Sequence, residues 1–147
     1  MRRLLAPLGT LLVTAPLLAG CASDREVYCE AVQENQTELS EIAAQGGQEA
    51  LIDALDIYRE LQEKAPRDIT DEWDQVVGAV EALDEVLTDA GVDPATYDPE
   101  KPPEGVTEEQ QRAIADAASE VGSRETVAAL SGVEQQARDV CKTPLTL

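Results

Sequence analysis

The chain has 147 residues and a formal net charge of −19, with 30 acidic residues against 11 basic ones and no histidine. A surface this acidic repels nucleic acid, which excludes a nucleic-acid partner. The absence of histidine excludes histidine-based catalytic triads, His-containing zinc sites and haem–histidine ligation. No other catalytic constellation stands out, so we expect a single small domain that is not an enzyme.

The first segment of the chain, residues 1–20, has the composition of a secretory leader. Arg2 and Arg3 precede a long apolar run, and small residues follow before Cys21. A cationic start, an apolar middle and a small-residue cleavage site are typical of a signal peptide. The apolar run is shorter than the ~20 residues of a membrane-spanning helix. An uncleaved anchor, or a cut at another small residue, is the alternative.

The leader ends in Leu18-Ala19-Gly20-Cys21, which resembles the lipobox of bacterial lipoprotein precursors. The resemblance implies cleavage before Cys21, a diacylglycerol on its thiol and a further acyl chain such as palmitate on its amine. It implies membrane lipid as the partner of Cys21, no other cofactor, and a place on the extracytoplasmic face of the cell membrane. Residues 21–25 would form the lipidated N-terminus and a short tether. The composition, with more arginine than lysine, resembles that of small actinobacterial lipoproteins.

The other two cysteines, Cys29 and Cys141, lie near the two ends of the remaining chain. An even pair in an exported protein predicts a structural disulfide. A redox pair or a metal–thiolate site is the alternative. Redox pairs, however, lie close together in sequence, and two thiolates without histidine make an incomplete metal site.

Hydrophobic spacing predicts three helices in the first part of the domain, at about 24–45, 48–64 and 68–90. Gly46 and Gly47 are expected to end the first, and Pro66 the second. Asp68 is the expected N-cap of the third. The third helix has the most regular apolar stripe of the chain, formed by Ile69, Trp73, Val76, Val80, Leu83, Leu87 and Ala90.

Residues 91–106 contain four prolines and two glycines, which forbid a helix. A long loop in a small domain is often functional, so we consider this segment a candidate partner-binding loop. Its candidate residues are Asp93, Tyr97, Asp98 and Glu100. Calcium binding by the loop acids is an alternative, but the ligand spacing of an EF-hand is absent and no metal site is expected.

A last helical region is predicted over residues 107–142. Thr107 and Gln110 form a capping box at its start. Gly122-Ser123 is expected to break it, with Ser123 capping the restart. Its expected stripe after the break consists of Val127, Leu130, Ala137 and Cys141, with Val133 as a further candidate.

These elements predict an all-α domain over residues 26–147, arranged as a compact up-down four-helix bundle. The fourth helix would be broken near Gly122-Ser123, and the Pro-rich loop would join helices three and four. An even number of helices brings the first and last ends together, which the predicted disulfide requires.

Two functions fit this architecture. The first is a membrane-anchored envelope interaction or structural module, which would dock an envelope protein through the loop or an acidic helix face. The second is a ligand-binding lipoprotein that holds a small apolar or cationic molecule between helices, around Trp73, Tyr58 and Tyr28. A fully packed bundle would favour the first function, and a pocket of ~300 Å³ or more with convergent polar groups would favour the second.

Overall fold

The computed structural model describes residues 23–47 and 49–147; the leader and Cys21 lie outside this part of the chain. Within it the chain is all-helical, with six α-helices, one short π-helix and no strand. The all-α class is therefore confirmed. The elements are α1 Asp24–Gln45, α2 Ala50–Asp53, α3 Leu55–Lys64, α4 Thr70–Ala90, α5 Glu108–Val121, α6 Arg124–Gln136 and the π-helix η1 Ala137–Cys141.

The first helix, α1, begins with a capping box that the sequence analysis missed. The backbone N–H of Glu26 donates to Ser23 Oγ at 3.3 Å, and the N–H of Ser23 donates to the Glu26 carboxylate at 2.7 Å. The Ser23 hydroxyl donates to the same carboxylate at 3.1 Å, and the two bonds that this carboxylate accepts, the backbone one first, lower the pKa of Glu26 because they favour its ionised form. The bounds of α1 agree with the helix predicted at about 24–45, so Asp24 and Arg25 belong to the helix and not to the tether expected over residues 21–25. Gly46 ends it with a φ of 63°.

The single helix expected over 48–64 consists of α2 and α3. They meet at Ala54, where ψ changes to −8°. The two helices share Ala54, whose N–H donates to the Ala50 carbonyl and whose carbonyl accepts the Tyr58 N–H, so α3 follows α2 directly. Because α2 has only four residues, it can cover only a short length of the helices that pack against it.

The start of α4 differs from the expectation for Asp68. Ile69 occupies the N-cap position, and no side chain caps this helix. A turn from Pro66 replaces the cap, since the Ile69 N–H and the Thr70 hydroxyl both donate to the Pro66 carbonyl, at 3.1 and 3.2 Å. The helix ends at Gly91 in the left-handed conformation, as predicted.

The region after the loop contains α5, α6 and η1. The Thr107–Gln110 capping box is present, with bonds of 2.9 and 3.2 Å. Ser123 caps the restart, its Oγ accepting the Thr126 N–H at 3.1 Å. The buried face of α6 and η1 keeps Val133 and Ala137 of the expected stripe, with Leu130 and Cys141 packed against the core. It differs at Val127, which is 54% exposed, while Thr126 and Ala129 are buried.

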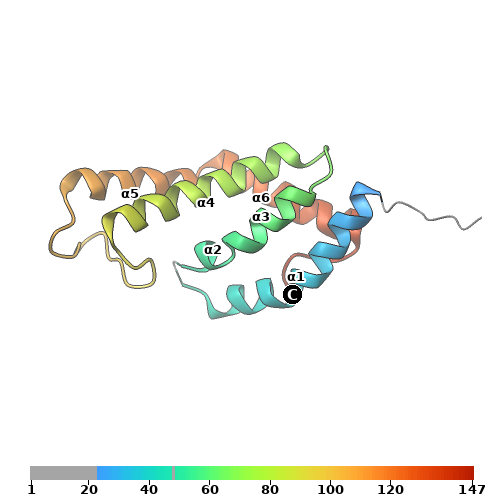
Figure 1. Cartoon of the computed structure of the whole chain (residues 1–147), viewed down its shortest axis with the longest axis horizontal. Helices are drawn as coiled ribbons and strands as arrows, with labels where there is room; N and C mark the ends of the chain where they lie inside the picture. The colour runs from blue at the N-terminus through green and yellow to red at the C-terminus, as the bar shows by residue number, and fades with distance from the viewer. Residues whose placement is uncertain (1–22, 48) are drawn as a thin grey trace, which may run out of the picture.

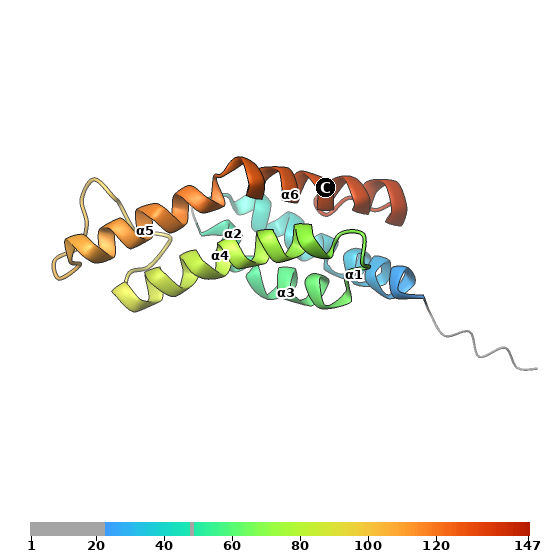
Figure 2. The same cartoon turned by 90° about the horizontal axis from the view of Figure 1, so that it is seen from above.

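The helices lie along one long axis, and α4 is at the centre of the arrangement (Figures 1 and 2). It contacts α3, α5 and α6, while α1 packs against α3 and η1. The beginning of α1 and the loop after α4 lie at opposite ends of this axis in both views. No helix within the described residues has the length and hydropathy to cross a membrane.

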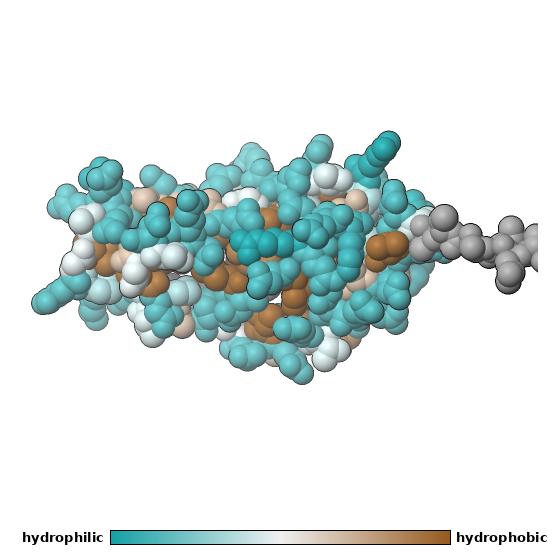
Figure 3. Space-filling view, in the orientation of Figure 1, coloured by the Kyte–Doolittle hydropathy of each residue, from teal (hydrophilic) through white to brown (hydrophobic). Residues whose placement is uncertain are grey.

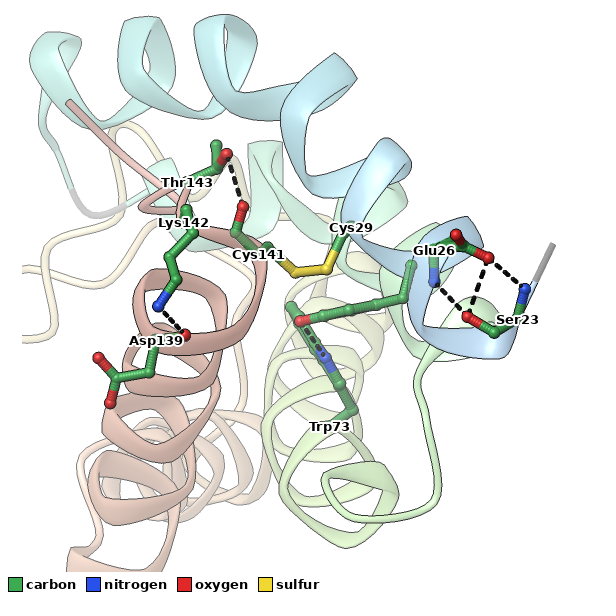
Figure 4. Close-up of a disulfide and its surroundings, with 9 residues drawn as sticks. Ser23, Glu26, Cys29, Trp73, Asp139, Cys141, Lys142 and Thr143 are labelled. Atoms are coloured by element: carbon green, nitrogen blue, oxygen red, sulfur yellow. Dashed lines mark hydrogen bonds between the residues drawn. A yellow bond between two sulfur atoms is a disulfide. The ribbon is translucent and has the colours of Figure 1, made fainter.

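Trp73 lies in the main core, between α1, α3 and α4. It is fully buried, its Nε1 donates to Tyr28 Oη at 3.2 Å, and its ring centroid is 5.7 Å from that of Tyr58. A disulfide joins Cys29 of α1 to Cys141 of η1, with a Cα–Cα distance of 5.0 Å (Figure 4). The first and last helical elements of the described chain are thus linked covalently, as the cysteine count predicted.

Candidate ligand-binding groove

A second, smaller apolar cluster lies away from Trp73, where α4, α5 and the loop meet. Its buried members are Leu87, Tyr97 and Ile114. Ile52 of α2 and Leu83 of α4 pack against it and are only partly buried. The helical domain therefore has a main core next to the disulfide and a smaller apolar cluster toward the loop.

Between α2, α4, α5 and the loop is a cavity of about 530 Å³ that is partly open to solvent. We call it the distal groove, because it lies toward the end of the molecule opposite the start of α1. In Figure 3, apolar surface is visible along the middle of the molecule, surrounded by hydrophilic residues. The groove is lined by Gly47, Leu51, Ile52, Leu83, Leu87, Pro94, Tyr97, Pro99, Gln111, Ile114, Ala115, Ala118 and Val121.

The groove exists because two long helices have only short or small partners in this region. Leu83 and Leu87 continue the apolar stripe of α4, and they face the four-residue α2, the loop and Ile114 of α5. On α5 the wall includes Ala115 and Ala118, whose small side chains are exposed and leave space. The apolar stripe of α4 thus extends beyond the part of this helix that other helices cover.

The loop is held in a defined conformation by its own acidic residues. Asp93 Oδ1 accepts the Ala95 N–H at 2.9 Å, and Asp98 Oδ1 accepts the Glu100 N–H at 2.9 Å. Side chains that accept a backbone N–H two residues on are typical turn formers. The two turns place Tyr97 between them, and its side chain is 8% exposed.

The α5 helix is attached to the loop by two glutamines. Gln111 Nε2 donates to the Val106 carbonyl at 3.0 Å. Gln110 Nε2 donates to the Asp89 carbonyl, near the end of α4, at 3.3 Å. These bonds hold the two ends of the loop and the start of α5 together, so the groove wall is fixed at that end.

Among the described residues, the lining contains no charged side chain, and Tyr97 and Gln111 are its only polar side chains. One carboxylate, that of Glu49, lies close to the lining. It occupies the space next to Gly47 that a Cβ atom at this position would fill. No group of His, Cys, Asp or Glu side chains in the described ranges is arranged to hold a metal ion. The arrangement is suited to hold an apolar molecule.

The four candidate loop residues divide into two kinds. Asp93, Asp98 and Glu100 are exposed, and the first two use one carboxylate oxygen each for the turns. Tyr97 turns inward and forms part of the groove wall. Binding of a partner by the loop stays a prediction. The lipidation site, Cys21, lies outside the described residues.

The expected ligand position around Trp73, Tyr58 and Tyr28 lies in the main core and outside the distal groove. The rings of all three are buried in the main core, and Tyr58 borders only a small void of about 90 Å³. A void of this size holds no more than a few water molecules. The larger cavity is at the far end of α4, between that helix, α2, α5 and the loop.

The sequence contained one signal that could have located the groove. The stripe of α4 extends through Leu87 to Ala90, whereas the apolar residues of α5 are alanine apart from Ile114 and Val121. A long apolar stripe facing small side chains and a Pro-rich loop implies space between them. A comparison of the chain with protein-family models, with curated proteins and with solved structures finds no match.

Proposed function

We propose that this chain is a lipid-anchored extracytoplasmic lipoprotein that works as a non-enzymatic envelope module and binds an apolar ligand in the distal groove. The observation that carries the proposal is the groove itself. Its volume of about 530 Å³ lies within the ~300–1,000 Å³ of typical ligand sites, and its walls are apolar. This favours the ligand-binding function over a purely structural one.

The proposed anchor agrees with the position of the groove. With lipid on Cys21, the membrane surface would lie two residues before Ser23, the N-cap of α1. The 22 residues of α1 span about 33 Å, and Gly47, which lines the groove, follows its end. The groove would therefore stand roughly 30 Å from the anchor. The Cys29–Cys141 disulfide suits the oxidising compartment that this location implies.

We also infer that the six helices act as an up-down four-helix bundle, in which α2–α3 and α5–α6 each count as one interrupted helix. The disulfide supports this inference, because it joins the start of α1 to the end of η1. The α1–α3, α3–α4 and α4–α5 contacts support it as well, since helices that follow each other in the chain pack together.

A neutral, environment-sensitive dye such as Nile red tests the groove. We expect saturable binding with a blue-shifted emission, because an apolar site excludes water from the dye. Ala118→Phe should abolish it by filling the groove, whereas Ala128→Phe, at an exposed alanine of α6 outside the lining, should leave it unchanged. Equal binding by both variants, or none by the unmodified protein, would contradict ligand binding in the groove.

Metabolic labelling with an alkyne fatty acid tests the anchor. The full-length protein should take up the label and sediment with membranes, and Cys21→Ser should do neither, because the acylated thiol is lost. Ser23→Ala, a change two residues away, is the matched control. Label that persists in Cys21→Ser would argue against this anchor.

A partner-docking function remains the second candidate, because three carboxylates of the loop (Asp93, Asp98 and Glu100) are exposed at one end of the molecule. Such a face would suit a basic surface on an envelope protein. Capture of one defined envelope protein by the unmodified chain and by Ala118→Phe, but not by Glu100→Lys, would favour docking over ligand binding.

A further inference from the structure

We propose that the ligand of the distal groove is a single aliphatic chain whose head group is not anionic, with cationic amphiphiles binding best. This inference rests on the proposed function and names the chemical class of its ligand. The argument concerns three properties of the groove: the polarity of its walls, its volume and the charge around it.

The walls favour a hydrocarbon over a peptide. The lining has two polar side chains, and one of them, Gln111, already donates its amide N–H to the Val106 carbonyl. An extended peptide brings a backbone donor and acceptor at almost every residue, and those groups cost free energy when they are buried without partners. A hydrocarbon chain has no such groups, so it can be enclosed by these walls without loss.

The volume matches one chain. Taking ~30 Å³ for each methylene, about the share of a water molecule in the liquid, the groove holds on the order of 15 methylene groups. The walls of the groove are aliphatic apart from the ring of Tyr97. The wall on α5 is shallow where it is formed by the small side chains of Ala115 and Ala118. A flexible, narrow ligand fits such a wall better than a broad, rigid one.

The charge around the groove sets the head group. The Glu49 carboxylate lies beside Gly47, and the exposed acids Asp93 and Asp98 flank the lining residues Pro94, Tyr97 and Pro99 in the loop. Arg112, next to Gln111, is the one opposing charge that adjoins the lining in sequence. With a net charge of −19 on the whole chain, an anionic head group is repelled and a cationic one attracted.

Amphiphiles with the same dodecyl chain and different head groups test this inference. The trimethylammonium, maltoside and carboxylate forms are titrated below micelle formation into residues 22–147, which include the whole described core and the disulfide. Methyl NMR spectra report the position of binding. Signals of Ile52, Leu83, Leu87 and Ile114 should shift, while those of Val32 and Val76 in the main core should not.

We expect the trimethylammonium form to bind at least roughly tenfold more tightly than the carboxylate form, with the maltoside between them. High salt should reduce the difference, because it screens the charges at the mouth. Ala118→Phe should weaken all three, and Ala128→Phe none.

Three outcomes would overturn the inference. The first is the absence of saturable shifts with any dodecyl compound while Nile red still binds; the groove would then be a ligand site for another class, and the proposed function would stand. The second is the carboxylate binding as tightly as the trimethylammonium form. The third is groove signals that shift with protein concentration alone and a dimer in sedimentation, which would make a second copy the occupant. If Nile red fails as well, the proposed function fails with it.

Discussion

At the scale of single residues, the hydrogen bond between Trp73 and Tyr28 decides how the main core is built. Trp73 carries an N–H that has to be paired when the ring is buried, and Tyr28 Oη accepts it at 3.2 Å. Burial raises the pKa of Tyr28 to about 12, and the nearby Asp68 charge adds to this, while the hydrogen bond from Trp73 opposes it. The pair joins α1 to α4 in a region where no other polar contact between them is recorded.

Tyr28→Phe should lower the free energy of unfolding by about 1–3 kcal/mol at neutral pH, because the buried Trp73 N–H loses its acceptor. The folded pKa of Tyr28 lies above its ordinary value of 10.0, so its contribution is fully present below pH 10 and is lost as the pH rises toward 12. The variant should therefore lose less stability over that interval. Burial also raises the pKa of Tyr58, so some alkaline loss persists.

Urea denaturation at neutral pH and at several pH values between 10 and 12 measures both effects. If the variant and the original protein lose the same stability over the alkaline interval, Tyr28 does not titrate as the structure implies.

At the scale of elements, local side-chain bonds set the start of three helices, α1, α5 and α6. Ser23, Thr107 and Ser123 each cap a helix through a side-chain oxygen that accepts a backbone N–H. Such caps can be recognised from neighbouring residues alone, and two of these three were predicted. Helix α4 has no side-chain cap and starts from a turn at Pro66, which is why the prediction for Asp68 was wrong.

Thr107→Ala should lower the free energy of unfolding by about 1 kcal/mol, because the Gln110 N–H loses its acceptor at the start of α5. Ser119→Ala, at an exposed position within the same helix, provides the control and should have little effect. The midpoints of urea denaturation compare the two variants. Equal midpoints for Thr107→Ala and the unmodified protein would show that this cap contributes nothing.

At the scale of the whole molecule, the disulfide and the distal groove lie on opposite sides of the main core. Cys29 and Cys141 are separated by 112 residues and close nearly the whole described chain into one loop. The groove is formed by α2, α4, α5 and the 91–107 segment, none of which contains a cysteine. One end of the domain is thus covalently closed, and the other is an open apolar site.

Replacing both Cys29 and Cys141 by alanine should lower the free energy of unfolding by up to ~4–5 kcal/mol, because a loop this long restricts the unfolded chain strongly. Helical content, measured by circular dichroism in the folded state, should change little, and the groove should still bind Nile red. A loss below about 1 kcal/mol would mean that the unfolded chain is already compact. Loss of dye binding in a folded double variant would contradict the separation of the two ends.

Much of the fold could be predicted because it depends on short-range patterns. The limits of α1 and the end of α4 at Gly91 follow from hydrophobic spacing and glycine, and the disulfide from the cysteine count. The candidate site could be predicted only in part. The loop was recognised from its prolines, but the inward position of Tyr97 depends on which helices face it.

By itself, the sequence determined the all-α class, the acidic surface, the cysteine pair and most helix ends, because each depends on composition or on residues within one or two turns of each other. The tertiary structure alone decided that α2 is short, that Val127 is exposed and that the apolar stripe of α4 extends beyond the helices that cover it. These features arise from the relative lengths and positions of elements far apart in the chain. An apolar stripe has the same sequence pattern whether a neighbouring helix covers it or a groove leaves it open.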